Sequence, residues 1–203
     1  MEQRLSGAGL RRDLSDPLLV CCRGQVGLTV LQDDRAGWMY SEAEIETFAE
    51  RLRTADEQGV RDCLQRDPGL AVAKLPSGWP VFLEQSVFPQ PSIIDLMIAA
   101  GADPDAGSPE GETLLHLTGD PEAIGKLLSH GADINALDSR GYTPMMGHAP
   151  CPETGPDAIY TLFAAGADPH VQGADGRTVF DLLPEGERFD RLRRHLREKG
   201  RNR

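Results

Sequence analysis

The tripeptide Gly-Ala-Asp at residues 101–103, 131–133 and 166–168 marks three similar segments of this 203-residue chain. Ten residues after each first glycine stands a second glycine, which is followed by one variable residue and a threonine. An offset kept three times, at a spacing of roughly 33 residues, is typical of a chain built from stacked repeats. Repeats in such a solenoid contact only their neighbours, and solenoids of this kind usually bind other proteins.

The residues before each Gly-Ala-Asp tripeptide predict a helix. Positions seven, four and three before the glycine are apolar in every copy, namely Ile94, Met97 and Ile98, then Ile124, Leu127 and Leu128, then Ile159, Leu162 and Phe163. This spacing places the apolar side chains in one stripe along a helix. The glycine that follows can adopt the left-handed conformation that ends a helix.

A second, shorter helix is predicted after each Gly-x-Thr triplet. The apolar runs 113–117 and 143–146 begin at a threonine, which is a good N-cap residue, and Pro144 follows at the first helical position. Each unit therefore contains a short helix, a connection, a longer helix and a glycine stop. The loop that leads from this stop to the next threonine is called a finger below.

With these motifs the chain resembles the ankyrin-repeat family, whose consensus carries Gly-x-Thr-Pro-Leu-His and a later Leu-Leu-x-x-Gly-Ala-Asp. The strongest matches are residues 111–116 and 127–133, whereas residues 178–181 lack the proline and the histidine. Weaker matches lie upstream, at residues 78–83 and in an apolar stripe formed by Val60, Cys63 and Leu64. The excess of arginine over lysine is compatible with GC-rich coding and favours a bacterial source.

The resemblance implies an all-α solenoid of about four ankyrin repeats. We expect the repeats to occupy residues 41–184, with a capping box at Ser41 and Glu44 opening the first helix. Residues 185–203 are expected to form a capping helix and a basic tail, with Phe189, Leu192 and Leu196 turned inward. A basic binding strip is the alternative for this segment.

Residues 1–40 do not fit the repeat and are expected to form a partly mobile N-terminal appendage. The alternation of Val26, Leu28 and Val30 predicts a small β-hairpin, which would cover the open end of the first repeat. The alternative is that Trp38 and Tyr40 contact a partner.

Charge and composition exclude several classes of partner and location. The formal net charge is −11, although residues 185–203 carry eight basic and four acidic side chains. An acidic body argues against nucleic acid, because binding phosphates requires cations. It favours a basic protein partner, although solubility alone would also account for it. We predict no membrane span, no signal peptide and a cytoplasmic location, because the four cysteines show no disulfide framework.

The chain shows little sign of chemistry. The family resemblance implies that His116 forms a hydrogen bond between repeats. His148 and Cys151, with Cys21 and Cys22, have metal-like residue types but a poor arrangement for tetrahedral zinc, and no group orients a His148–Cys151 nucleophile pair. The carboxylates of the first finger could attract calcium, but its two prolines fit a rigid exposed loop better. We therefore predict no catalytic residue, no metal and no cofactor.

Binding is expected at the fingers and at an insertion. Residues 147–156 hold three prolines and two glycines and lengthen the third unit, and insertions in repeat proteins often lie on the binding face. In ankyrin-repeat proteins the partner usually lies against the fingers and the short helices. The predicted partner-binding residues are Leu137, Ser139, Arg140, Tyr142, Glu110, Glu112, Arg177 and Asp175. For Tyr142, packing against the neighbouring finger is an equal alternative.

Two classes of function remain. The first is a non-catalytic protein-binding module, monomeric when free. By analogy it could be an immunity protein that neutralises a cognate bacterial toxin by occlusion, with a regulatory scaffold or a host-targeted effector as alternatives. The second class is an enzyme that uses the N-terminal appendage or the 148–156 loop. A neighbouring toxin gene would favour immunity, whereas an ordered metal or a deep polar pocket would favour the enzyme.

Overall fold

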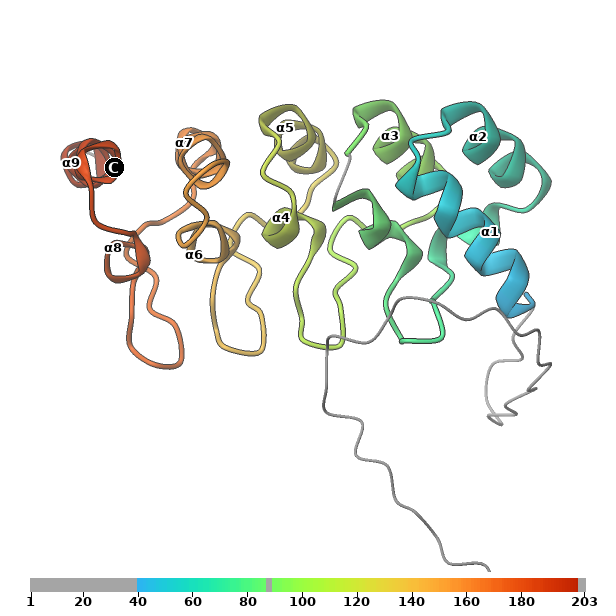
Figure 1. The fold of residues 1–203 in the computed structure, drawn as a ribbon, viewed down its shortest axis with the longest axis horizontal. Helices are drawn as coiled ribbons and strands as arrows, with labels where there is room; N and C mark the ends of the chain where they lie inside the picture. Colours follow the sequence, from blue (N-terminus) through green and yellow to red (C-terminus); the bar gives the residue numbers. More distant parts are fainter. Residues whose placement is uncertain (1–39, 87–88, 201–203) are drawn as a thin grey trace, which may run out of the picture. The chain divides into compact units, whose positions relative to one another are not determined.

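The repeats fold into successive helix pairs, each with one helix beside the fingers and a second helix farther from them (Figure 1). The computed structural model describes residues 40–86 and 89–200. The first pair is α1 (Glu42–Arg53) with α2 (Glu57–Arg66), and the short helix η1 (Pro68–Val72) follows it. The later pairs are η2 (Val81–Ser86) with α3 (Pro91–Ala99), α4 (Leu114–Leu117) with α5 (Pro121–Ser129), α6 (Pro144–His148) with α7 (Gly155–Ala165), and α8 (Val179–Leu182) with α9 (Glu187–Gly200).

Helices of the same kind pack against each other in a row. In the layer away from the fingers, α3 lies between α2 and α5, α7 packs on the other side of α5, and α9 packs on α7. In the layer beside the fingers, α4 lies between η2 and α6, and α6 contacts α8. The paired, all-helical arrangement predicted from the repeats is therefore confirmed for the part of the chain that the structure describes.

Local sequence chemistry accounts for where the helices begin and end. The predicted capping box is present, because the Ser41 side chain accepts a hydrogen bond from the Glu44 backbone and the Glu44 carboxylate accepts one from the Ser41 N–H. The predicted glycine stops have left-handed φ angles of 107° at Gly101, 88° at Gly131 and 114° at Gly166. These angles strain residues that carry a Cβ atom, so the glycines end α3, α5 and α7 at defined points.

The buried stripe differs from the prediction by one position on α3 and α5, whereas Phe163 of α7 is buried as predicted. Leu127 is fully buried, but Leu128 is only partly buried, and its place in the core is taken by Ala123 beside Ile124. Ile98 of α3 is likewise only partly buried. The reason is that α5 packs between α3 and α7, which turns positions eight, seven and four before the glycine toward its neighbours. The predicted burial of Leu128 is therefore wrong.

The insertion in the third unit is shorter than the sequence indicated. Helix α6 extends to His148 and α7 begins at Gly155, so only residues 149–154 form a loop. Proline at position 156 is accommodated because it lies in the first turn of α7, where a helix needs no N–H donor. Pro150, Cys151 and Pro152 are all exposed in this loop.

Of the predicted N-terminal appendage, residues 1–40, the structure describes only the last residue. The predicted β-hairpin and Trp38 lie outside the described residues. Tyr40 is described, and its hydroxyl donates a 2.7 Å hydrogen bond to the Asp67 carboxylate. This bond, with minor contributions from burial and nearby carboxylates, raises the pKa of Tyr40 to about 12. Tyr40 therefore contacts the segment between α2 and η1.

Candidate protein-binding surface

Four fingers share one turn geometry. In each turn the first residue donates its N–H to the carbonyl of the fifth, and the fourth donates its N–H to the carbonyl of the first, at 2.8–3.0 Å. The fourth residue is always a glycine with positive φ. The turns span residues 75–79, 108–112, 138–142 and 173–177, and they are called the first to the fourth finger turn.

A buried side chain fixes two of these turns from within. Asp138 accepts hydrogen bonds from the backbone N–H groups of Arg140 and Tyr142 at 2.9 and 2.8 Å, and Ser108 holds the preceding turn in the same way. Burial favours the neutral form of Asp138, but these bonds and Arg140 outweigh it and lower the pKa of the carboxyl. The sequence did not predict that Asp138 holds the turn from within. Its place at the start of a turn was the available signal, since aspartate commonly bonds the backbone two residues on.

Side chains of neighbouring fingers join in one polar network. Arg140 forms ion pairs with Glu112 at 3.1 Å and with Asp138 at 2.6 Å, and its guanidinium lies 5.0 Å from the centre of the Tyr142 ring. The Tyr142 hydroxyl donates a 2.6 Å hydrogen bond to Asp175 of the next finger. Asp175 in turn pairs with Arg177 at 3.4 Å. The hydrogen bond between Tyr142 and Asp175 raises the pKa of Tyr142 and lowers that of Asp175.

The structure thus brings five of the eight predicted binding residues together. They are Glu112, Arg140, Tyr142, Asp175 and Arg177, and a shallow hollow of about 380 Å³ is lined by Arg140, Tyr142, Ala174 and Asp175. Leu137, Ser139 and Glu110 are exposed on the same fingers. Tyr142 does pack against the neighbouring finger, because its ring lies where a Cβ atom on Gly173 would be. Whether these residues bind a partner stays a prediction.

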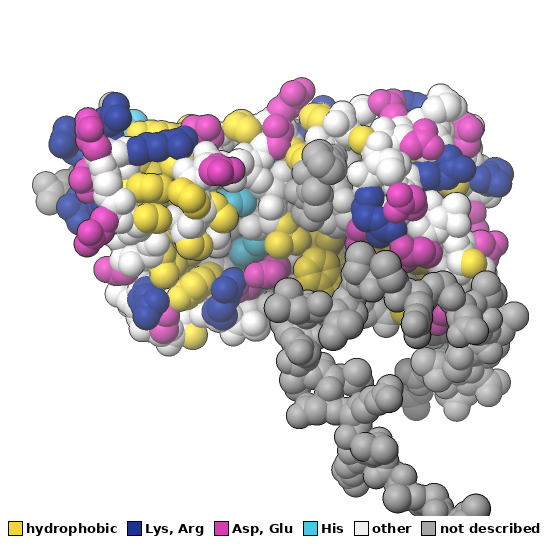
Figure 2. All heavy atoms as spheres, in the orientation of Figure 1, with side chains coloured by type: hydrophobic (Ala, Val, Ile, Leu, Met, Phe, Trp, Pro, Cys, Tyr) yellow, Lys and Arg dark blue, Asp and Glu magenta, His cyan; other side chains and the backbone are white. Residues whose placement is uncertain are grey.

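The 149–154 loop lies at the opposite end of α6 from the finger. Its residues contact other elements: Thr154 lies close to Gly119, and Arg188 of α9 donates to the carbonyls of Pro152 and Glu153 at 3.1 and 3.4 Å. Hydrophobic side chains gather over α6, α7 and α8 on the face shown in Figure 2. A partner that touches both the second and third fingers and this loop would have to cross α6.

The two histidines considered for chemistry are both structural. His116 Nδ1 accepts the Thr113 N–H at 3.1 Å, and Nε2 lies 3.0 Å from the Tyr142 carbonyl, so this side chain links two units as the resemblance implied. His148 is buried, with Nε2 2.9 Å from the Leu115 carbonyl. Cys151 is exposed on the loop. Within residues 40–86 and 89–200, no group of three or more His, Cys, Asp or Glu could hold a metal ion.

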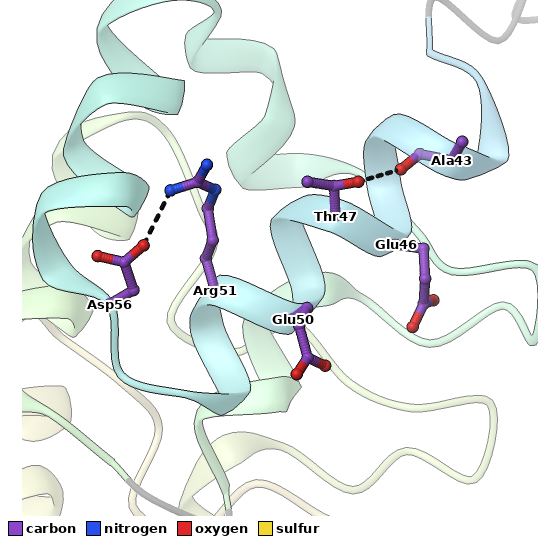
Figure 3. Close-up of a pocket in the computed structure, with 6 residues that line it drawn as sticks. All are labelled: Ala43, Glu46, Thr47, Glu50, Arg51 and Asp56. Atoms are coloured by element: carbon purple, nitrogen blue, oxygen red, sulfur yellow. Dashed lines mark hydrogen bonds and ion pairs between the residues drawn. The ribbon is translucent and has the colours of Figure 1, made fainter.

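A second hollow, which the sequence did not indicate, lies on α1 (Figure 3). Its volume is about 640 Å³, and it is lined by Ala43, Glu46, Thr47, Glu50, Arg51 and Asp56. Arg51 pairs with Asp56 at 2.8 Å. Glu46 and Glu50 both pair with Arg53, which also holds Glu84. These carboxylates therefore neutralise Arg51 and Arg53, and the ion pairs connect α1 to the start of α2 and to η2.

Comparison with known proteins supports the family suggested by the motifs. No family model matches the chain. It is 30% identical over 168 residues to an ankyrin repeat-containing protein of Treponema pallidum (strain Nichols), which covers 78% of this chain and 54% of that protein. It is also 35% identical over 82 residues to mouse protein phosphatase 1 regulatory subunit 27, over 39% of this chain and 52% of that protein. For the human protein of the same name the identity is 36% over 78 residues, 37% of this chain and 49% of that protein.

The chain thus spans about half the length of the curated relatives it matches. No helix within the described residues is long and apolar enough to cross a membrane. The repeated motifs, the paired helices, the glycine stops and these relatives all agree, and the chain belongs to the ankyrin-repeat family.

Proposed function

We propose that this chain is a non-catalytic protein-binding module whose partner lies on the second to fourth finger turns. The observation that carries the proposal is the network from Glu112 through Arg140 and Tyr142 to Asp175. It holds three fingers in one arrangement before a partner arrives. A surface ordered in advance loses less conformational entropy on binding, which leaves more of the contact energy for affinity.

The charges left over on the fingers favour a basic partner. Arg140 and Arg177 are paired with carboxylates of this chain, so neither offers an unpaired cation. Glu110 is exposed, and Leu137 on the next finger, with 58% of its surface exposed, offers an apolar side chain to a partner. An apolar anchor among carboxylates suits a protein surface that carries lysine or arginine around an apolar patch.

Within this class we propose an immunity protein that neutralises a cognate bacterial toxin by covering its active site or the surface its substrate needs. Toxins that act on nucleic acids or nucleotides present basic clefts, to which an acidic finger surface is complementary. A regulatory subunit is the second candidate. It is favoured by the names of the mouse and human relatives, which are regulatory subunits of protein phosphatase 1.

The test compares two double variants as immobilised bait in extracts of the source organism, with captured proteins quantified by mass spectrometry. Arg140→Ala with Tyr142→Ala changes the fingers, and Glu122→Ala with Ser129→Ala changes the exposed side of α5. We expect the finger variant to lose the partner and the α5 variant to retain it. Equal capture by both would place the partner elsewhere.

A toxin and a regulated enzyme are then separated by the captured protein itself. Expressed alone, a toxin arrests growth and the wild-type chain restores it. If the captured protein is harmless and its enzymatic rate changes on addition of the chain, the regulatory candidate is correct. Tyr142→Ala removes a hydrogen bond, so the binding experiment is run well below the melting temperature of each variant.

A further inference from the structure

The fourth finger turn contains the one Asp-Gly dipeptide of this sequence, at Asp175 and Gly176. In the other three turns the residue before the glycine is Ser77, Glu110 or Arg140. An aspartate followed by glycine rearranges more readily than other pairs, because glycine has no Cβ atom that would hinder attack by its nitrogen on the preceding side chain. The backbone of the fourth turn can therefore react in a way that is closed, or much slower, in the other three.

The reaction needs no partner other than water. The Gly176 nitrogen forms a bond to Cγ of Asp175, and its proton leaves with the carboxyl hydroxyl as one water molecule, which closes a five-membered succinimide ring. Water then adds to one of the two ring carbonyls. Opening at the side-chain carbonyl restores aspartate, whereas opening at the main-chain carbonyl gives isoaspartate. In isoaspartate the main chain runs through Cβ and Cγ and is longer by one methylene group.

The structure holds both reacting groups in an unreactive arrangement. The Gly176 N–H, whose proton must be lost, donates to the Gly173 carbonyl at 2.9 Å. One carboxylate oxygen of Asp175 accepts the Arg177 N–H at 3.0 Å, and the other accepts the Tyr142 hydroxyl at 2.6 Å. Attack makes Cγ tetrahedral and expels one of its oxygens, so it cannot proceed while all three hydrogen bonds are in place.

The Tyr142 hydroxyl also controls the protonation of this carboxyl group. Its hydrogen bond, with a smaller contribution from the Arg177 N–H, lowers the pKa of Asp175. The carboxyl therefore stays ionised at neutral pH, and an ionised carboxylate resists attack because its oxygen leaves as water only when it is protonated. Loss of the Tyr142 bond would raise the neutral fraction and release one of the two oxygens.

We propose that Asp175 and Gly176 form a site of spontaneous isomerisation, which the Tyr142 hydroxyl of the neighbouring finger keeps inactive. When this hydrogen bond breaks, the fourth turn converts to isoaspartate. All the bonds involved lie within the third and fourth finger turns, and none involves a segment after α9. The network between the fingers thus protects the covalent structure of the fourth turn in addition to holding its position.

Isomerisation would remove the fourth turn from the finger surface. The turn is closed by the Gly173 N–H on the Arg177 carbonyl at 2.8 Å and by the Gly176 N–H on the Gly173 carbonyl at 2.9 Å. A main chain that is longer by one methylene group no longer matches both bonds. The carboxylate moves to Cα, so the bond from Tyr142 is lost as well. The resulting loss of partner binding, unlike the modification itself, rests on the proposed function.

The test follows isoaspartate in the full chain during incubation at neutral pH and 37 °C. Trypsin releases residues 141–177 as one peptide, in which mass spectrometry with electron-based fragmentation distinguishes aspartate, succinimide and isoaspartate. Tyr142→Phe keeps the ring and removes the hydroxyl, so we expect isoaspartate to form about tenfold faster, as for the loss of one hydrogen bond to a charged group. Tyr160→Phe is the control, because Tyr160 contacts His195 on α9, and should leave the rate unchanged. Equal rates in the wild type and Tyr142→Phe overturn the proposal.

Two further variants establish where the reaction occurs and what controls it. Asp175→Glu should abolish it, because glutamate would have to close a six-membered ring, which forms much more slowly. Isoaspartate that persists in this variant would place the reaction at Asp157 or Asp168 of the same peptide. Leu127→Ala destabilises the array at α5 and leaves the Tyr142 hydroxyl in place. If it accelerates isomerisation as much as Tyr142→Phe does, general unfolding controls the rate and the proposal is wrong.

Capture of the partner separates this site from the proposed function. Tyr142→Phe is used as bait before and after incubation, and we expect capture to fall in proportion to the isoaspartate that has formed. Unchanged capture by a fully isomerised chain contradicts the loss of binding and leaves the modification site established. If the Arg140→Ala with Tyr142→Ala variant retains its partner, the proposed function fails, whereas the rates of isomerisation stand independently of it.

Discussion

His116 joins two repeats through both of its ring nitrogens. Nδ1 accepts a backbone N–H, so it carries no proton, and Nε2 donates to the Tyr142 carbonyl. The side chain must therefore be neutral to keep both bonds. Burial, more than any other effect, lowers the pKa of His116 below its ordinary value of 6.5, and burial likewise lowers the pKa of His148.

Stability should fall as the pH drops below the unfolded-state pKa of these histidines. In this range the unfolded chain binds protons that the folded chain resists, so each buried histidine contributes stability above about pH 6.5 that is lost progressively in acid. Urea unfolding at pH 7.5 and pH 5 measures this loss. His116→Gln retains a donor and an acceptor without the titration, and we expect it to reduce the difference between the two pH values. An unchanged difference would mean that His116 does not contribute.

Neighbouring leucines of α5 should differ in their contribution to stability. Leu127 is fully buried, so Leu127→Ala should cost about 2–5 kcal/mol of unfolding free energy. Leu128 is partly exposed, so Leu128→Ala should lower the unfolding free energy by clearly less. Denaturant unfolding of the two variants provides the comparison. Equal losses would indicate that the stripe predicted from sequence, and not the one in the structure, is correct.

At the scale of single elements, α9 packs on α7 in the layer of longer helices. Phe189, Leu192 and Leu196 are buried, while most of its other side chains are charged. Arg193 donates to the carbonyls of Leu183 and Pro184 at 2.6 and 2.9 Å, which holds the turn before the helix. One apolar face and one polar face are what the predicted capping role of this helix requires.

Helix α9 should therefore contribute to stability through its buried face. Leu192→Ala should lower the unfolding free energy by about 2–5 kcal/mol, because the side chain is fully buried. Arg194→Ala changes an exposed residue of the same helix and should be nearly neutral. Thermal and urea unfolding of the pair would test this. Similar stability for the wild type and Leu192→Ala would show that α9 is not part of the folded array.

At the scale of the whole molecule, charge is more evenly neutralised than the sequence suggested. The chain carries a net −11, yet Asp138, Glu112 and Asp175 are paired with arginines on the fingers. What remains for steering a partner is the smaller set of exposed carboxylates, including Glu110. Exposed charges mainly accelerate association, and salt screens them beyond a Debye length of about 8 Å at physiological ionic strength.

Association with a basic partner should slow as salt increases, while dissociation changes less. Glu110→Lys should slow association further, and it tests charge better than Glu112→Lys, which would also break the pair with Arg140. Glu122→Lys on the exposed side of α5 is the control and should have a smaller effect. Stopped-flow or surface-based kinetics with the captured partner provide the rates. Association that does not depend on salt would refute electrostatic steering while leaving the binding module in place.

The repeats, the helix pairs, the capping box and the glycine stops were predictable because they depend on residues close together in the chain. A 3.6-residue period, a capping side chain and a glycine with positive φ each act within a few positions. The eight predicted binding residues were identified from the sequence by their place in the repeat. Five of them form one network in the structure, although their role in binding remains a prediction.

Only the tertiary structure decided what those side chains contact. Arg140 pairs with a carboxylate 28 positions earlier, and Tyr142 bonds one 33 positions later, so both depend on how neighbouring repeats stack. The same stacking left Leu128 partly exposed and bound His148 to a backbone carbonyl. Contacts between repeats depend on the packing of whole elements, which a local pattern cannot specify.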